Sequence, residues 1–128
     1  MTRSDSRVAV YTGSFDPVTL GHLNVMQRSS RLVDTLIVGV GVNIEKQSLF
    51  SPNERVDMIE RVTAPLGNVV VKQFTGLAVS FVRASGARVI IRGVRSLTDM
   101  EAEFTMTLAN RKLDPGIETV FLMADDEF

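Results

Sequence analysis

The sequence predicts an α/β protein with a doubly wound, five-stranded parallel sheet and helices on both of its faces. Five short apolar runs alternate with four segments of helical periodicity, which is typical of βαβ units and therefore of a parallel sheet. Polar and glycine-rich clusters follow the predicted strands, where ligands bind in such sheets. A length of 128 residues suits one domain with a substantial core.

The first strand and helix are predicted near the N-terminus. Residues 8–12 form a β-branched and aromatic run that Gly13 closes. The helical pattern that follows has one shared apolar face, made by Leu20, Leu23, Met26 and Val33. The second strand is predicted over residues 35–42, and a polar loop over residues 43–50.

The second helix carries a strong start signal. Ser51 stands at the N-cap, Pro52 at the first helical position, and Glu54 can bond back to the N-cap backbone, which together form a capping box. We expect this helix to run to about Thr63. The third strand is predicted over residues 69–74.

The C-terminal half is predicted to alternate between helix and strand. Gly86 ends one helix, and the Asp-Pro-Gly run at residues 114–116 ends the longest one. The predicted helices are residues 77–85 and 99–113, and the predicted strands are residues 89–92 and 119–123.

Composition and charge exclude several classes of protein. Hydrophobic residues make up 45% and charged residues 23%, as in ordinary globular domains. The net charge of -1 attracts neither nucleic acid nor an anionic membrane, so any anion site is local. The absence of cysteine excludes disulfides, thiolate metal sites and a cysteine nucleophile. With no export signal and no long apolar run, we expect a cytoplasmic protein without nucleic-acid or membrane partners.

The segment GSFDPVTLGH, residues 13–22, combines a glycine turn, a hydroxyl group and a histidine at a predicted helix start. Helix N-termini offer unpaired N–H groups and the positive end of the helix dipole, which suit phosphate. The segment matches neither the Walker A nor the GxGxxG pattern. We interpret His22, the only histidine, as a donor to a phosphate oxygen; the alternative is a surface or helix-capping histidine.

Two arginines flank Gly93 at the end of the fourth predicted strand. Arg92 and Arg95 are suited to clamp a polyphosphate, whereas solvated surface charge is the alternative. Glu103 can accept hydrogen bonds from a ribose or pair with an arginine. Lys46 follows a strand, and by position alone it is an ordinary solvated cation.

The acidic run at residues 125–127 allows a magnesium site, but a solvated terminus is the favoured interpretation, and we assign no metal ligand. The candidate site thus contains several phosphate binders and no evident nucleophile, metal cage or acid–base pair. This pattern favours phosphoryl or nucleotidyl transfer by positioning and charge stabilisation over a hydrolase triad.

The string YTGSFDPVTLGH, residues 11–22, resembles the nucleotide-binding signature of the nucleotidylyltransferase superfamily. Within that superfamily the chain is similar to the bacterial phosphopantetheine adenylyltransferases from about Val8 to its end. The stretches that carry this likeness are RGVRSLTDMEAEF at residues 92–104, LANRKL at residues 108–113, FSPNERV from Phe50 and VFLM ending at Met123.

The resemblance implies a Rossmann-like subunit that joins ATP and 4'-phosphopantetheine into dephospho-coenzyme A and pyrophosphate, with Mg²⁺ as helper. Ser14 and His22 match the family's catalytic positions. The implied ATP contacts are Ser14, Phe15, His22, Gly93, Val94, Arg95, Glu103 and Phe128. The implied acceptor contacts are Ser14, Lys46, Leu77, Ala78 and Arg92.

Family members continue with a serine-rich loop and a C-terminal helix, whereas this sequence ends at Phe128. We expect residues 1–128 to form a single nucleotidylyltransferase domain, C-terminally short relative to the family. The resemblance also implies a homo-oligomer, a hexamer. Departures from the family pattern predict a looser pocket with the chemistry retained, and they fall at Thr12, Ala78, Met100 and Ala102.

Two other functions remain open at this point. One is an adenylyltransferase for another phosphate acceptor such as nicotinamide mononucleotide, against which residues 92–104 argue. The other is a nucleotide-binding module that is inactive through loss of the C-terminal loop.

Overall fold

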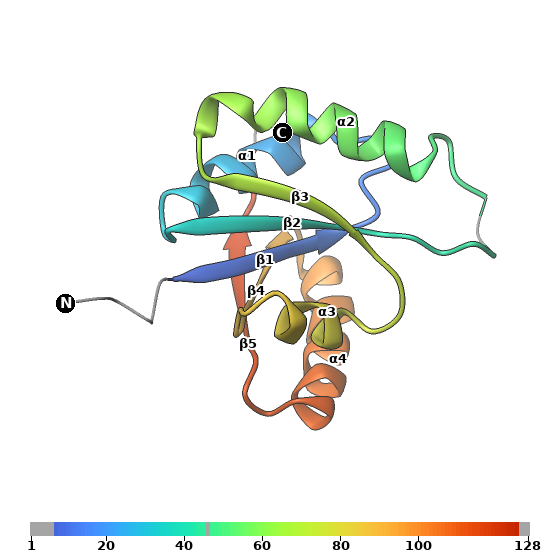
Figure 1. The fold of residues 1–128 in the computed structure, drawn as a ribbon. Coiled ribbons are helices and arrows are strands. Elements are labelled where there is room, and N and C mark those ends of the chain that lie inside the picture. The colour runs from blue at the N-terminus through green and yellow to red at the C-terminus, as the bar shows by residue number, and fades with distance from the viewer. Residues whose placement is uncertain (1–6, 46, 126–128) are drawn as a thin grey trace.

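The computed structural model describes residues 7–45 and 47–125, which form a parallel five-stranded sheet with helices on both faces (Figure 1). The predicted fold class is therefore confirmed. The strands are β1 (Val8–Gly13), β2 (Thr35–Gly41), β3 (Val69–Phe74), β4 (Val89–Val94) and β5 (Glu118–Met123). The helices are α1 (Leu20–Ser30), α2 (Pro52–Thr63), α3 (Ala78–Ala84) and α4 (Leu97–Leu113), with a 3-10 turn η1 (Ala64–Leu66) after α2.

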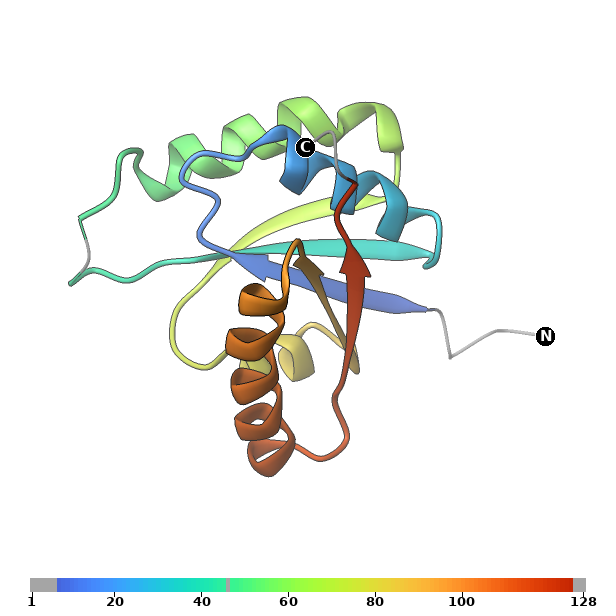
Figure 2. The ribbon, with the colours of Figure 1, turned by 180° about the vertical axis from the view of Figure 1, so that it is seen from behind.

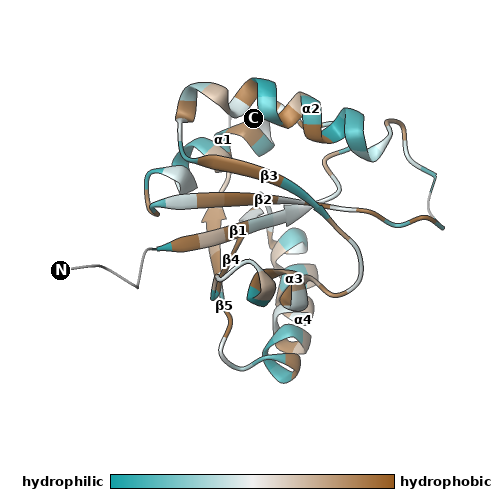
Figure 3. Cartoon of the chain, in the orientation of Figure 1, coloured by the Kyte–Doolittle hydropathy of each residue, from teal (hydrophilic) through white to brown (hydrophobic). Residues whose placement is uncertain are grey.

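Helices α1 and α2 lie on one face of the sheet, and α3 and α4 lie on the other (Figures 1 and 2). Alternate residues of a strand point to opposite faces, so the neighbours Val10 and Tyr11 belong to different cores. Hydrophobic residues gather in the strands, while α2 alternates hydrophilic and hydrophobic residues (Figure 3). The core under α1 and α2 includes Tyr11, Met26, Leu36, Val38 and Ile59. The core under α3 includes Val10, Ile37, Val82, Ile90 and Ile117.

The strand order β3-β2-β1-β4-β5 changes direction between β1 and β4. The chain first builds outward from β1 to β3 and then returns to add β4 and β5 on the other side. In doubly wound sheets such a switch point leaves a crevice beyond the carboxyl ends of the two central strands. Tyr11 is paired with Ile91, so the segments that follow β1 and β4 meet at this edge.

Local side-chain bonds decide where two of the helices begin. The predicted capping box of α2 is confirmed: Glu54 N–H donates to Ser51 Oγ at 3.2 Å, and Ser51 N–H donates to Glu54 Oε1 at 2.9 Å. Helix α4 begins at Leu97, two residues before the predicted start. The reason is that Ser96 Oγ accepts the N–H of Asp99 at 3.1 Å and so acts as the N-cap.

Helix α1 ends at Ser30, so Val33 lies beyond it, and Leu20 is exposed; the predicted shared apolar face of this helix was therefore wrong at both ends. Most other element ends differ from the predictions by one or two residues. Strand β4 continues to Val94 rather than residue 92, because it pairs with β5 as far as Met123. Helix α3 is one residue shorter at each end than predicted, since Leu77 has extended backbone. Among the described helices, none is both long and apolar enough to cross a membrane.

Candidate active site

The structure brings the phosphate-binding candidates of β1 and β4 together at one edge of the sheet. Ser14 and Phe15 lie in the turn after β1, and His22 lies in the first turn of α1. Arg92 is in β4, and its Nη1 donates to the carbonyl oxygen of Thr12 at 2.5 Å, which joins the two central strands at their carboxyl ends. The loops after β2 and β3 end at the same edge (Figure 1).

His22 forms a capping box with Thr19 at the start of α1. The N–H of Thr19 donates to His22 Nδ1 at 3.0 Å, and the N–H of His22 donates to Thr19 Oγ1 at 3.2 Å. Because Nδ1 accepts a hydrogen bond, the ring proton belongs on Nε2. The helix-capping interpretation of His22 is therefore confirmed, and it leaves Nε2–H as a donor.

The surroundings of His22 favour the neutral ring. Burial lowers the pKa of His22 below its ordinary value of 6.5, and the positive charges of Arg95 and Arg92 lower this pKa further. His22 is thus suited to donate a hydrogen bond to a phosphate oxygen as a neutral imidazole.

The ring of Phe15 packs against the ring of His22. Its side chain is only 3% exposed and packs edge-on against His22, with ring centroids 5.0 Å apart. Its φ of 48° is in the left-handed region, which is uncommon for a non-glycine residue and marks a tight turn. A Cβ on Gly13 would lie 2.9 Å from the Phe15 ring. The buried side chain of Phe15 thus packs under His22 and is not open to solvent.

Arg92 is held by a two-pronged ion pair. Its Nε donates to Glu103 Oε1 at 2.6 Å and its Nη2 donates to Glu103 Oε2 at 2.9 Å. This hydrogen bonding raises the pKa of Arg92 above its usual range. The sequence left either a ribose or an arginine as the partner of Glu103, and in the structure the partner is Arg92. A ligand phosphate at Arg92 must therefore share the guanidinium with Glu103.

The end of β4 carries the other predicted nucleotide contacts. A Cβ on Gly93 would lie 2.9 Å from Val25 Cγ2, so glycine allows α1 to pack closely on the strand. Val94 is 5% exposed. Arg95 extends into solvent with 71% of its side chain exposed, and its Nε lies 3.6 Å from Asp99 Oδ2. Arg95 is thus the more available cation of the pair.

One of the two predicted acceptor residues at the start of α3 lies beside this network. Leu77, the N-cap of α3, is 54% exposed. Ala78 lines a narrow cavity of about 20 Å³ together with Arg92 and Glu103. Helix α4 closes this cavity with Met106, Thr107 and Asn110.

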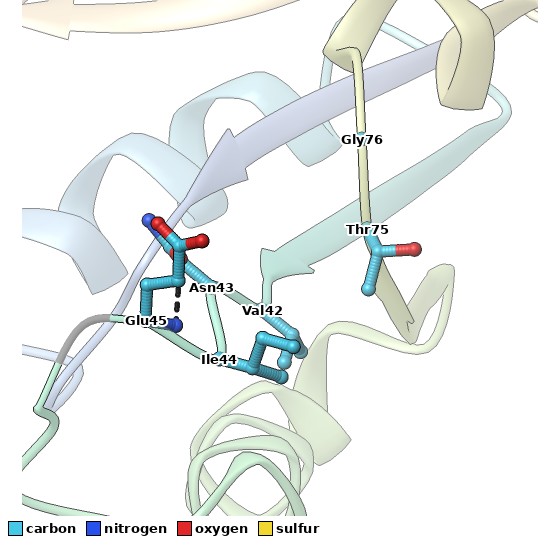
Figure 4. Close-up of a pocket in the computed structure, with 6 residues that line it drawn as sticks. All are labelled: Val42, Asn43, Ile44, Glu45, Thr75 and Gly76. Carbon is cyan, nitrogen blue, oxygen red and sulfur yellow. Dashed lines mark hydrogen bonds between the residues drawn. The ribbon is translucent and has the colours of Figure 1, made fainter.

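A larger open pocket of about 610 Å³ lies between the loops after β2 and β3 (Figure 4). The N–H of Glu45 donates to Asn43 Oδ1 at 3.0 Å, which shapes the β2 side of the pocket. The residues that line it are Val42, Asn43, Ile44, Glu45, Thr75 and Gly76. Residues 42–45 after β2 and residues 75–76 after β3 thus face a shared space.

Some predicted positions lie outside the described residues. These include the acceptor-binding candidate Lys46 and the ATP-binding candidate Phe128. Of the acidic run at residues 125–127, only Asp125 is described, and its Oδ2 accepts a hydrogen bond from Asn24 Nδ2 at 3.1 Å. Across residues 7–45 and 47–125, no three His, Cys, Asp or Glu side chains are grouped so as to hold a metal ion.

Sequence reasoning missed several residues that shape this site. Thr19 stands three residues before His22, and this spacing of a capping box was available as a signal. Asp16 and Arg55 each bond to segments more than 30 residues away in the chain. No local pattern indicates such contacts.

The fold and the site define a class of protein, and comparisons with known proteins agree. A doubly wound sheet with phosphate-binding groups at its switch point is suited to nucleotide transfer. Residues 10–127 match the model of the cytidylyltransferase-like family, and the chain belongs to that family.

Two relatives narrow this assignment. The chain is similar to phosphopantetheine adenylyltransferase of Rhodopirellula baltica, with 60% identity over 121 residues that cover 94% of this chain and 68% of that protein. It is also similar to the protein of that name from Clostridium botulinum, with 49% identity over 122 residues that cover 95% of this chain and 77% of that protein. Within the cytidylyltransferase-like family, the chain belongs to the phosphopantetheine adenylyltransferases.

A solved structure supports the fold. A bifunctional NMN adenylyltransferase/ADP ribose pyrophosphatase from Francisella tularensis matches with a TM-score of 0.71 and 17% identity, covering 96% of this chain and 39% of that one. At this low identity the likeness concerns the fold alone. Nicotinamide mononucleotide as acceptor is therefore not favoured over phosphopantetheine.

Proposed function

We propose that this protein transfers the adenylyl group of ATP to 4'-phosphopantetheine, giving dephospho-coenzyme A and pyrophosphate. The observation that carries the proposal is the grouping of His22 and Arg92 at the carboxyl ends of β1 and β4, where the bond from Thr19 to Nδ1 leaves His22 Nε2–H as a donor. Membership of the phosphopantetheine adenylyltransferases supports the choice of substrates.

On the ATP side, the proposed contacts follow the ends of β1 and β4. Ser14 lies at the exposed turn and is proposed to touch both reacting phosphates. His22 donates from Nε2 to an ATP phosphate oxygen, and Arg95 supplies a solvent-exposed cation. The further proposed contacts are the Phe15 backbone, Gly93, Val94, Glu103 and Phe128.

On the acceptor side, we propose that Arg92 binds the 4'-phosphate together with Lys46. The ion pair with Glu103 fixes the guanidinium plane in advance, so less rotamer entropy is lost when phosphate binds. Leu77 is exposed and apolar at the rim, and Ala78 lines the cavity beside Arg92, which suits the pantetheine arm.

In the proposed step, an oxygen of the acceptor's 4'-phosphate attacks the α-phosphorus of ATP in line with the bond to the leaving group. A new P–O bond forms, the bond between the α-phosphorus and the bridging oxygen breaks, and pyrophosphate leaves with the electron pair. His22 Nε2–H and the arginines stabilise the charge that grows on the phosphate oxygens. This role needs orientation and neutralisation rather than a covalent enzyme intermediate.

Magnesium is proposed as part of the nucleotide substrate. Mg²⁺ prefers oxygen ligands and commonly reaches nucleotide sites on the substrate's phosphates. Arg92 and the exposed Arg95 are proposed to neutralise phosphate charge together with the metal. Chelation by EDTA is expected to abolish turnover, and excess Mg²⁺ to restore it.

We also propose a homohexamer. Helix α4 buries none of its residues, and it exposes large apolar side chains on its surface. Such a patch is unusual on a monomer. The side chains concerned are Leu97, Phe104, Met106, Leu108 and Leu113, with Val120 and Met123 on the edge strand β5. Light scattering should give a mass near six times 14.1 kDa.

The function is tested by pyrophosphate release from ATP with 4'-phosphopantetheine or nicotinamide mononucleotide as acceptor. The chain is assayed beside a version extended with the C-terminal segment of the Rhodopirellula baltica relative, and that relative is the positive control. We expect pyrophosphate release from ATP when 4'-phosphopantetheine is the acceptor and none when nicotinamide mononucleotide is the acceptor. ATP binding without release from either version, while the relative turns over, would contradict the proposal. The single-domain organisation over residues 1–128 and the cytoplasmic location stay predictions from the sequence.

A further inference from the structure

The loop between β2 and α2, described over residues 42–45 and 47–51, is connected to the turn after β1, residues 14–17, directly at its far end and through a side chain of α2 at its near end. We call these segments the acceptor loop and the catalytic turn. The acceptor loop forms one wall of the open pocket of Figure 4. The catalytic turn carries Ser14. Two side chains with no assigned role, Asp16 and Arg55, make the connections.

Asp16 fixes the far end of the acceptor loop. Its Oδ2 accepts the N–H of Leu49 and its Oδ1 accepts the N–H of Phe50, both at 2.8 Å. A carboxylate that accepts two consecutive backbone N–H groups makes short, charge-assisted hydrogen bonds. These bonds set the position of the chain immediately before the N-cap of α2, Ser51.

Arg55 fixes the near end. Its Nη1 donates to the carbonyl oxygen of Ser14 at 2.9 Å and to that of Gly41 at 3.3 Å, so one guanidinium group spans the ends of β1 and β2. Arg55 is only 4% exposed, and it forms no salt bridge with a carboxylate among residues 7–45 and 47–125. Its Nε has no hydrogen-bond partner within the same ranges. A buried cation held only by carbonyl groups is costly for stability, which points to a role in positioning.

We infer that Asp16 and Arg55 are positioning residues that hold the acceptor loop at a fixed position relative to the catalytic turn. Ser14, the proposed contact to both reacting phosphates, is bonded through its own carbonyl to Arg55. The pocket wall, residues 42–45, lies between these connections, with Gly41 before it and Leu49 and Phe50 after it. This inference rests on the proposed function, because it places the acceptor next to the acceptor loop and ATP next to the catalytic turn.

This arrangement predicts a kinetic split. Asp16→Asn keeps the size of the side chain but replaces one accepting oxygen with an NH2 group, so one loop N–H loses its partner. The acceptor KM should rise about tenfold, the effect of one charge-assisted hydrogen bond, with the ATP KM little changed. Arg55→Lys keeps the charge but loses the branched guanidinium group. It should raise the acceptor KM and also lower kcat, because it releases the carbonyl of Ser14.

The experiment measures initial rates with both substrates varied, together with amide hydrogen exchange of Leu49 and Phe50 by NMR. Asp57→Asn and Arg61→Lys are matched controls: these residues form an exposed pair on the same helix, with Arg61 Nε 3.0 Å from Asp57 Oδ2. Urea unfolding of every variant distinguishes loss of folded protein from displacement of the acceptor loop relative to the catalytic turn. The expected result is faster exchange at one or both of these amides in Asp16→Asn, a raised acceptor KM in both Asp16→Asn and Arg55→Lys, and neither change in the controls.

Two results would overturn the inference. One is unchanged exchange of the Leu49 and Phe50 amides in Asp16→Asn. The other is a parallel rise of both KM values, or a loss of rate that follows the loss of stability in urea. Failure of the proposed function is distinct from these: the wild-type protein would then release no pyrophosphate, while the exchange data would still report on the two connections.

Discussion

The two sides of the crevice hold their phosphate-binding groups in different ways. On the β1 side, His22 is fixed by Thr19, three residues earlier in the same helix start. On the β4 side, Arg92 is fixed by Glu103 from helix α4 and by the carbonyl of Thr12 from β1. One side is built from local backbone bonds and the other from contacts between separate elements.

This difference matters for binding. The bonds of His22 with Thr19 use Nδ1 and leave the Nε2 proton for a ligand. Most of the donors of Arg92 are already engaged, so a phosphate that binds there competes with the Glu103 carboxylate. We therefore expect substitutions on the β1 side to affect mainly the rate, and those on the β4 side mainly the affinity.

Replacement of His22 by alanine should have the largest effect. Loss of a preorganised donor to the transition state typically lowers kcat by about 10²-fold or more. The ATP KM should change far less, because the remaining contacts still bind the nucleotide. Steady-state kinetics of pyrophosphate release would measure both constants. Equal losses in rate and affinity would show that His22 only binds ATP.

Replacement of Arg92 by alanine should raise the acceptor KM by about tenfold or more, since it removes a charge-assisted contact to phosphate. Arg111→Ala is the control, because Arg111 makes a comparable bond to Glu118, 2.7 Å long, on the exposed far part of α4. Titration with 4'-phosphopantetheine would measure the affinity. Unchanged acceptor affinity in Arg92→Ala would contradict the assignment.

The pH dependence should report on His22. The neutral ring is the active form, and burial and the nearby arginines place its pKa below 6.5 in the folded protein. The rate should therefore be constant above that pKa and fall as the pH drops through it. A kcat profile that instead falls as the pH rises through neutrality would indicate that the imidazolium is the active form.

The same shift links stability to pH. Because the unfolded chain binds the proton more tightly than the folded protein, the contribution of His22 is complete above pH 6.5 and is lost as the pH falls through the folded pKa. Urea unfolding at several pH values would measure this loss. The variant His22→Gln should lack this part of the dependence, and an unchanged profile would contradict the assignment.

Thr19→Val should have the smallest effect. The substitution removes the hydroxyl that caps α1 but keeps the backbone N–H that bonds to His22. The free energy of unfolding should fall by about 1 kcal/mol, as for other N-cap losses, and kcat should change less than in His22→Ala. Serine at this position should restore stability. A drop in kcat as large as that of His22→Ala would mean that the hydroxyl itself acts on the substrate.

The local parts of the molecule were the ones that sequence reasoning predicted well. The start of α2 depends on Ser51 and Glu54 alone, and both bonds are present. The strands were found because buried parallel strands are short apolar runs. The turn after β1 was recognised because its signal is also local: its glycine, hydroxyl group and histidine lie within ten residues of one another.

The contacts that sequence reasoning missed join distant parts of the chain. The partner of Glu103 stayed open because spacing along α4 does not show which strand faces the carboxylate. The burial of Arg55 was not predicted, since arginine is usually exposed and its bond to Ser14 spans 41 residues. Tertiary packing decides such contacts.

We expect the site to work through a neutral His22 that carries its proton on Nε2. Because this is the only histidine in the chain, a ¹⁵N NMR titration of the imidazole ring reports on it alone. We predict a protonated Nε2 and an unprotonated Nδ1 at pH 7, with a His22 pKa below 6.5. An imidazolium at pH 7, or a ring with its proton on Nδ1, would contradict it.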